Sequence, residues 1–408
     1  MAGSGAAVIR SKLTRVKRNN ITILHLITFF SSLYFYHQII TLYFQERGLN
    51  YVQINSLWGI IVGSKAIAEV PTGLIADRVG RRFSIIVALA LQLVGEIVFI
   101  FADSYLIFVT VSVIAGIGFA FLSGCFEAMM YDSLKSEGKE DEMQKVSGLN
   151  DSFAQLAIII GSLTGGFIAS DLRIESFILV IIITASFVAM ALVVSFFLRE
   201  PISEYKHSEQ STFALLKDGI GLLKSNRALR RIVLLYLLAT PFINYLLNLY
   251  QPYFVEANVP GVWFGIALSM ASLLGVLTSK YAYLLERQFG VNKGVLMATC
   301  LPGIFYILMA TISHSWISIA LFVFAYSSMN MQKPIFVDYT NRHIESKSRA
   351  TVLSLISMFS GVYVALMGLV IGGIADISLS WSFVFMGSII IIGTLLIRIE
   401  EIHVETVS

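Results

Sequence analysis

Five charged side chains stand inside long apolar runs of the sequence, where an uncompensated charge is costly. Lys65 and Glu69 share one run, and Glu96, Glu127 and Lys333 each interrupt another. In hydrocarbon a single charge costs on the order of 3 kcal/mol, so each of them should face a cavity or a partner. Carboxyl groups in such surroundings are suited to bind and release protons, and we therefore expect proton-dependent chemistry.

The spacing of these charges leaves several interpretations open. Lys65 and Glu69 are four residues apart on one helical face, so they either neutralise each other or take part in proton transfer. Glu127 and Lys333 occupy corresponding positions in two similar segments, where they would form an ion pair, a proton site or a clamp on a solute. We expect proton coupling to involve Glu127, Glu69, Lys65 and Glu96.

A second group of polar side chains is suited to hold a small organic molecule. Aromatic rings bind such molecules by stacking, and amides bind them by hydrogen bonds. The alternative for each residue is ordinary hydrogen bonding between helices. The candidates for a solute cavity are Tyr34, His37, Gln38, Asn244, Tyr245, Asn248, Tyr326, Asn330 and Lys333.

The elements that carry these residues are predicted to be membrane-spanning helices. The chain has 408 residues, of which 56% are hydrophobic, and its mean hydropathy of +0.78 is outside the range of soluble domains. Apolar runs of about 20 residues can cross the hydrocarbon as helices, and their lack of alternation disfavours a β-barrel. We expect twelve spans, at residues 20–45, 52–76, 83–102, 105–131, 147–170, 176–198, 230–255, 262–285, 292–312, 315–338, 350–375 and 380–399.

The basic residues predict the orientation of these spans. Of the 29 Lys and Arg residues, only Arg47 and Arg173 fall in one set of alternating loops, and Lys65, Lys280 and Lys333 fall within spans. All the others lie in the opposite set of loops or near the N-terminus. Positive charge accumulates on the cytoplasmic side, so we expect a multi-pass protein of the cell inner membrane with both termini in the cytoplasm.

The two halves of the chain resemble each other. The stretch GSLTGG at 161–166 corresponds to GLVIGG at 368–373, and Asp132 corresponds to Asp338, at similar offsets of 207 and 206 residues. Such duplicated halves are typical of transporters. We expect an all-α integral membrane protein with two pseudo-symmetric six-helix bundles, at 1–198 and 230–408, joined by a cytoplasmic linker at 199–229 that contains an amphipathic helix.

The most specific motif lies between the second and third spans. The stretch Gly73-x-x-x-Asp77-Arg78-x-Gly80-Arg81-Arg82 resembles the signature loop of the major facilitator superfamily, a family of membrane transporters. The resemblance implies that the loop acts as a conformational gate, and that one of its arginines pairs with Asp132 at the end of span four. The alternative is a loop whose positive charge only fixes topology.

Span five resembles a motif of the drug/proton antiporters in that family. Gly161, Gly165 and Gly166 match the motif and would let helices approach closely, whereas Ala157 and Ser162 replace a glycine and a proline of the motif. The resemblance favours proton-coupled export of a small organic solute by alternating access. The alternative is proton-coupled uptake of a nutrient, an organic anion or a metal chelate.

Other classes of chemistry find no support in the sequence. Cys125 and Cys300 lie in apolar runs and the six histidines are scattered, so neither a disulfide framework nor a metal site is expected. No glycine-rich phosphate loop is present, and the basic residues are too dispersed for a nucleic-acid surface. We therefore expect a monomeric transporter, not an enzyme, with no cofactor and no metal. Its partners would be a small-molecule substrate, protons and the lipid bilayer.

Overall fold

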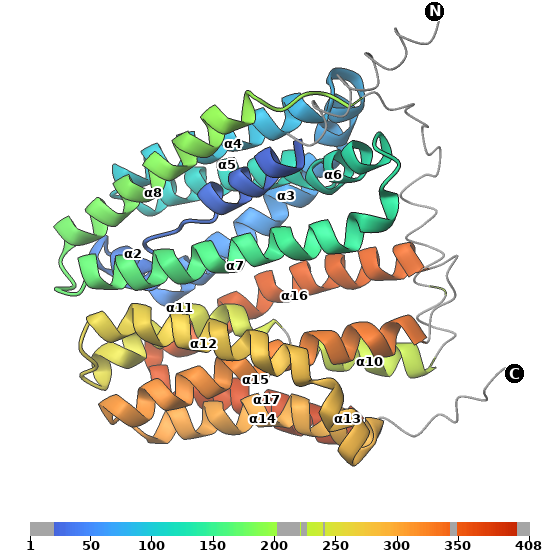
Figure 1. Cartoon of the computed structure of the whole chain (residues 1–408). Helices are drawn as coiled ribbons and strands as arrows, with labels where there is room; N and C mark the ends of the chain where they lie inside the picture. The colour runs from blue at the N-terminus through green and yellow to red at the C-terminus, as the bar shows by residue number, and fades with distance from the viewer. Residues whose placement is uncertain (1–19, 202–220, 222–226, 240, 343–348, 398–408) are drawn as a thin grey trace, which may run out of the picture. The chain divides into compact units, whose positions relative to one another are not determined.

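The chain is built from α-helices. The computed structural model describes residues 20–201, 221, 227–239, 241–342 and 349–397, and no strand occurs in these ranges (Figure 1). Internal contacts divide the chain into two units. The first unit comprises Met1–Ile39 and Ile60–His207, and the second comprises Ile40–Gly59 and Ser208–Ser408.

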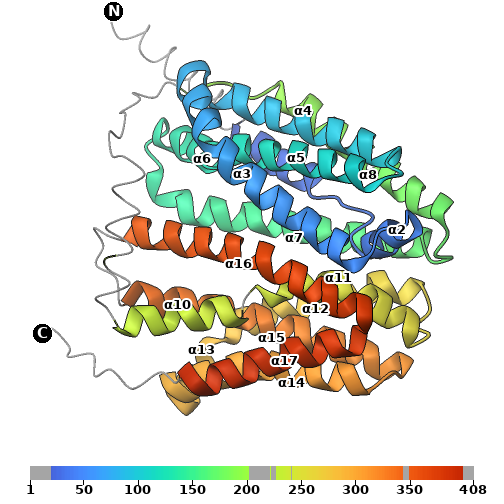
Figure 2. The same ribbon diagram turned by 180° about the vertical axis from the view of Figure 1, so that it is seen from behind.

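The first unit contains the signature loop and the buried carboxyl group Glu96. Helix α4 packs between α5 and α8, and all three run side by side in both views (Figures 1 and 2). Its helices are Asn20–Ser31, the larger part of α3 (Tyr51–Val79), α4 (Arg81–Ile100), α5 (Tyr105–Leu122), α6 (Cys125–Lys135), the short 3₁₀ helix η1 (Glu140–Glu142), α7 (Met143–Ile168) and α8 (Ile174–Ser195).

The second unit receives α2 (Ile40–Glu46) and the beginning of α3 in addition to the C-terminal helices. Helix α15 packs against both α12 and α14, and α17 packs against α14. The C-terminal helices are α10 (Arg227–Ala239), α11 (Phe242–Glu256), α12 (Val262–Tyr281), α13 (Tyr283–Phe289), α14 (Val291–Thr311), α15 (Ser315–Arg342), α16 (Arg349–Ile377) and α17 (Leu379–Ile397).

Ten helices or helix pairs of the described residues are long and apolar enough to cross a membrane. The two further expected spans are the first, whose helical part Asn20–Ser31 is short, and α15, which is 28 residues long but carries many polar side chains. The twelve-helix fold expected from the sequence therefore fits the structure. Most of the linker at 199–229, with its expected amphipathic helix, lies outside the described residues; only 199–201, 221 and 227–229 are described.

Spans one, four and eight, each predicted as one continuous helix, are interrupted; in span eight a turn at Ala282 separates α12 from α13. The expectation of one helix over residues 20–45 is wrong, because regular helix stops at Ser31 and resumes only at Ile40. Span four breaks between Leu122 and Cys125, where Gly124 adopts a left-handed φ of 72° that only glycine takes readily. The apolar pattern gives no sign of these breaks, since hydropathy measures burial and not backbone conformation.

The break in span one is buried inside the first unit. Leu33, Phe35 and Tyr36 are all less than 8% exposed. Irregular backbone at membrane depth is tolerated only where the protein itself satisfies its polar groups. Here the Phe35 N–H donates to Thr184 Oγ1 at 3.0 Å, and Gln38 Nε2 donates to the Phe35 carbonyl at 2.6 Å. We call residues 32–39 the broken segment.

Two glycines of the span-five motif make room for the broken segment. A Cβ added at Gly161 would lie 2.7 Å from the Tyr34 carbonyl oxygen, and one at Gly165 would collide with the Phe35 carbonyl oxygen. Gly166 is also buried, beside these two positions on α7. The glycines of the motif therefore lie against the backbone of the broken segment. Small residues usually let two helices pack closely, and here they admit main-chain carbonyls.

The corresponding glycines of the second half also lie close to main-chain carbonyls. A Cβ at Gly372 would lie 2.8 Å from the Tyr51 carbonyl oxygen, and one at Gly368 would lie 3.3 Å from the Asn55 carbonyl oxygen. Each glycine stretch of the repeat therefore receives main-chain carbonyls from an N-terminal segment within its own unit.

Replacement of Gly165 should destabilise the protein far more than replacement of Gly148 on the same helix. We expect Gly165→Ala to cost about 1–3 kcal/mol or more, because the added methyl meets backbone that cannot rotate away. A Cβ at Gly148 meets nothing within 4 Å, so Gly148→Ala should be neutral or slightly stabilising. The midpoint of thermal unfolding of the purified variants measures the difference, and equal midpoints would contradict this packing.

Candidate functional site

The signature loop is a one-residue connection between two helices. Helix α3 ends at Val79 and α4 begins at Arg81, which leaves Gly80 alone with a φ of 111°. A Cβ on Gly80 would lie 2.9 Å from Cδ of Glu200. Gly80 is therefore needed both for its backbone conformation and for the approach of a carboxylate. Gly73 lies inside α3, and a Cβ there would meet nothing within 4 Å.

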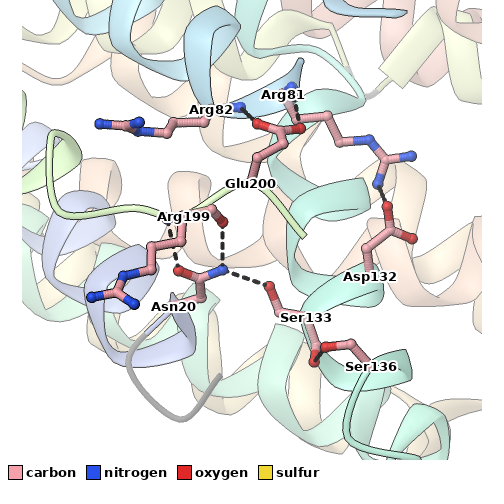
Figure 3. Close-up of polar contacts among 8 residues, drawn as sticks. All are labelled: Asn20, Arg81, Arg82, Asp132, Ser133, Ser136, Arg199 and Glu200. Carbon is pink, nitrogen blue, oxygen red and sulfur yellow. Dashed lines mark hydrogen bonds and ion pairs between the residues drawn. The ribbon is translucent and has the colours of Figure 1, made fainter. Parts of the chain in front are cut away.

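Glu200, which follows span six, caps the start of α4. Its Oε1 accepts the Arg81 N–H and its Oε2 accepts the Arg82 N–H, both at 2.8 Å (Figure 3). The first amides of a helix lack partners within the helix and carry partial positive charge, so a carboxylate is favoured there. Glu200 is not predicted from the sequence, because nothing in the sequence indicates that the end of span six returns to this loop.

Arg81 also forms the expected ion pair with Asp132. Arg81 Nη1 contacts Asp132 Oδ2, and the two side chains are 20% and 11% exposed (Figure 3). The contact predicted from the family resemblance is present, and its role as a gate stays a prediction. Arg82 Nη2 donates to the Phe196 carbonyl at 2.9 Å, which holds the end of α8 near the same loop. Asp77 and Arg78 are exposed at the end of α3.

Asn20 joins three parts of the same region. Its Nδ2 donates to Ser133 Oγ at 3.2 Å and to the Arg199 carbonyl at 2.9 Å, and its Oδ1 accepts the Arg199 N–H at 3.1 Å (Figure 3). Ser133 follows Asp132 on α6. The start of span one, the end of span four and the end of span six are therefore bound together around the loop, and only the Asp132 contact was expected.

A second cluster surrounds Glu96 within the membrane-spanning part of α4. The Tyr36 hydroxyl of the broken segment donates to Glu96 Oε1 at 2.8 Å. One turn earlier on α4, Gln92 donates to the Tyr34 hydroxyl at 2.8 Å. The rings of Tyr34 and His37 stack with centroids 4.7 Å apart. The sequence predicts Tyr34 and His37 for a solute cavity and Glu96 for proton coupling, and the structure brings these three residues into one cluster with Tyr36 and Gln92.

Glu96 has no basic partner in the described part of the chain. It is 6% exposed, none of the ion pairs found there includes it, and its Oε2 is buried without a hydrogen-bond donor. A buried carboxylate without a compensating charge is costly. The geometry therefore suits a group that binds a proton and releases it when its surroundings change.

The other candidates for proton coupling are in more open surroundings. Lys65 Nζ lies 3.8 Å from Glu69 Oε1, and both side chains are at least 40% exposed. Ser123, at the break in span four, donates its hydroxyl to Glu69 Oε1 at 3.0 Å. Glu127 is exposed in the first turn of α6. The expected Lys65–Glu69 ion pair is present. The hydrogen bond from Ser123 to Glu69 was not expected.

The polar residues of the second half are largely engaged within their own unit. Tyr245 donates its hydroxyl to the Val364 carbonyl, and Asn248 donates to Asn55 Oδ1 at 2.9 Å. Asn244 and Asn330 each bond a carbonyl of their own helix or its cap, those of Pro241 and Tyr326. The hydroxyl-bearing ring of Tyr326 packs near Phe322. The side chain of Lys333 lies outside the described residues.

The helices, the broken spans and the buried ionisable cluster define a multi-pass membrane protein with a transporter's architecture. The family model of the Major Facilitator Superfamily matches residues 21–362. The chain belongs to this superfamily, and the membership indicates a membrane transporter rather than an enzyme. The expected family is thus confirmed.

Known relatives agree over nearly the whole length. An uncharacterised MFS-type transporter, YxaM of Bacillus subtilis (strain 168), is 23% identical over 365 residues, which cover 88% of this chain and 90% of the relative. The crystal structure of the nucleoside transporter NupG has a TM-score of 0.76 at 14% identity, covering 94% of this chain and 98% of that chain. A bacterial homologue of the human lysosomal transporter Spinster has a TM-score of 0.71 at 14% identity, covering 96% and 99%.

The two signature glycines should respond differently to substitution. Gly80→Ala places a methyl in a left-handed conformation and against Glu200, so it should lower the unfolding midpoint and displace the cap. Gly73→Ala lies in open helical space and should be tolerated. Thermal unfolding of both variants tests this prediction, and a greater loss in Gly73→Ala would contradict it.

The Arg81–Asp132 pair should show strong energetic coupling. In a double-mutant cycle with Arg81→Gln and Asp132→Asn, we expect a coupling energy of about 0.5–3 kcal/mol, because both groups are mostly buried. The half-exposed Lys65–Glu69 pair is the matched control and should couple by only about 0.3–0.5 kcal/mol. Unfolding free energies of the purified variants give both values. Equal coupling of the two pairs would contradict the burial argument.

Proposed function

We propose that the protein is a secondary active transporter that moves a small organic solute by alternating access and exports it in exchange for protons. The role as a membrane transporter rests on family membership. The proton coupling rests on one observation, the buried Glu96 carboxyl group with Tyr36 as its hydrogen-bond donor. The direction rests on the resemblance of span five to the drug/proton antiporters. Proton-coupled uptake is the alternative.

The Glu96 cluster supplies a physical reason for coupling. When Glu96 carries a proton, the buried cluster is neutral and the Tyr36 hydroxyl can bond its carbonyl oxygen. When the proton leaves, a charge remains in apolar surroundings, and a conformation that admits water or a cation becomes favourable. Because Tyr36 lies in the broken segment, a change of charge at Glu96 acts directly on an irregular part of span one.

The contacts around the signature loop supply a candidate gate. They lie at the other end of α4 from Glu96. An ion pair that forms in one conformation biases a two-state equilibrium by its differential free energy. The Arg81–Asp132 pair and the Glu200 cap are suited to this role, because they connect the ends of spans two, three, four and six. The positive charges around the loop support the proposal that this face is cytoplasmic, as in an inner-membrane protein with both termini inside.

Three chemically different probes can test transport. One fold neighbour is a nucleoside transporter and another, a POT family transporter, was solved with 5-aminolevulinic acid. A nucleoside, 5-aminolevulinic acid and the lipophilic cation ethidium are therefore the first probes for proteoliposomes that contain a trapped pH dye. Proton movement against the probe indicates exchange, and movement with it indicates uptake by symport. Flux of a probe without proton movement would contradict proton coupling.

Glu96→Gln should uncouple transport from protons without abolishing solute exchange. Glutamine keeps the shape of the protonated acid and still accepts the Tyr36 hydrogen bond, but it cannot release a proton. We expect the flux driven by a pH gradient to fall at least about tenfold, whereas exchange of solute at equal concentrations persists. Glu175→Gln, on the exposed first turn of α8, is the control and should behave as the native protein. Unchanged gradient-driven flux in Glu96→Gln would contradict the role of Glu96.

A further inference from the structure

The start of α3 is an unusually well-capped helix terminus. Asn50 and Gln53 form a reciprocal capping pair: the Gln53 N–H donates to Asn50 Oδ1 at 2.9 Å, and the Asn50 N–H donates to Gln53 Oε1 at 3.1 Å. The Ile54 N–H donates to the Asn50 carbonyl at 3.0 Å. Neighbouring residues therefore accept the N–H groups of Asn50, Gln53 and Ile54. The N–H groups of Tyr51 and Val52 need another acceptor.

Asp376, at the end of α16, binds the two remaining amides. Its Oδ1 accepts the Tyr51 N–H at 2.7 Å, and its Oδ2 accepts the Val52 N–H at 3.2 Å. A carboxylate at a helix N-terminus gains from both hydrogen bonds and the helix dipole. The partners are more than 320 residues apart in the sequence, so this contact is tertiary and not a local cap.

Other side chains of the second unit hold the same segment. Gln251 Oε1 accepts the Thr41 N–H at 2.7 Å, and Asn248 donates to Asn55 Oδ1 at 2.9 Å. Gly368 and Gly372 admit the carbonyls of this stretch, as described above. Residues 40–59, here called the docked segment, are therefore fixed by α11 and α16.

Helix α3 continues from the docked segment into the first unit. It is a single helix of 29 residues, so its start and the signature loop are about 40 Å apart along its axis. Its residues from Ile60 onward belong to the first unit. A contact that fixes the start of α3 can therefore act on a helix whose other end carries the gate motif.

We propose that Asp376 is a positioning residue for transport: its carboxylate latches the start of α3 onto α16 in the conformation described here and releases it in the alternative conformation. This inference rests on the proposed alternating access. Asp376 acts through the two amides of α3. Its loss should shift the population toward the conformation in which the docked segment is free.

Thiol labelling tests the latch without any knowledge of the solute. In a background of Cys125→Ser and Cys300→Ser, Ile54→Cys places a reporter at a position that is 3% exposed in this conformation. The purified protein in nanodiscs is treated with a polar maleimide. We expect Asp376→Ala to raise the labelling rate roughly tenfold, and Asp376→Asn, which keeps one acceptor oxygen, to raise it less. Asp376→Glu should restore a rate near that of the reporter protein.

Asp171→Asn is the control, since Asp171 is an exposed aspartate that follows the corresponding glycine stretch of the first half. It should leave the labelling rate unchanged. A rate in Asp376→Ala equal to that of the control would overturn the latch, even if the protein transports solute. An increased rate together with normal unfolding midpoints would support it, even if proton coupling proves wrong. Should Asp376→Ala not fold, the comparison of Asp376→Asn with Asp376→Glu decides in the same way.

Discussion

Lipid offers no hydrogen bonds to a polypeptide backbone, and this constraint governs the first unit. Span one cannot unwind at residues 32–39 unless other side chains and a close neighbour satisfy and shield the exposed peptide groups. Thr184 and Gln38 provide hydrogen bonds, and Gly161 and Gly165 let α7 approach the backbone. The irregular conformation in turn directs Tyr36 toward Glu96, which a regular helix would place differently. The buried cluster around Glu96 therefore depends on the glycines of a helix that contributes no ionisable group to it.

The N-termini of α3 and α4 are capped in the same manner. Glu200 binds the first two amides of α4, and Asp376 binds the first two amides of α3. Each carboxylate comes from a distant part of the chain and lies within the same unit as the amides it binds. Such caps are modest in free energy, about 1 kcal/mol each, and this magnitude suits the proposed gate and latch, whose contacts would break and re-form during a transport cycle.

The sequence predicts the class of fold well because hydropathy and charge report directly on the lipid environment. It also predicts the Arg81–Asp132 contact, through the family resemblance of the loop. It does not predict the breaks at Ser32 and Gly124, because burial within the protein and burial in lipid select the same apolar residues. It cannot predict Glu200, Asn20 or Asp376, since their partners are brought near only by tertiary structure. The pair Ser31–Ser32, followed by a run of aromatic residues with weak helix propensity, is the one local signal for the first break.

Solid-state NMR of the protein in lipid bilayers can establish whether span one is broken and thereby places Tyr36 against Glu96. Selective ¹³C labelling of tyrosine, histidine and glutamate makes Tyr34, Tyr36, His37 and Glu96 observable. The structure predicts a non-helical backbone shift for Tyr34, which lies outside any helix or turn, and a cross-peak between the Tyr36 ring and the Glu96 carboxyl carbon. Helical shifts throughout, with no such cross-peak, would contradict it.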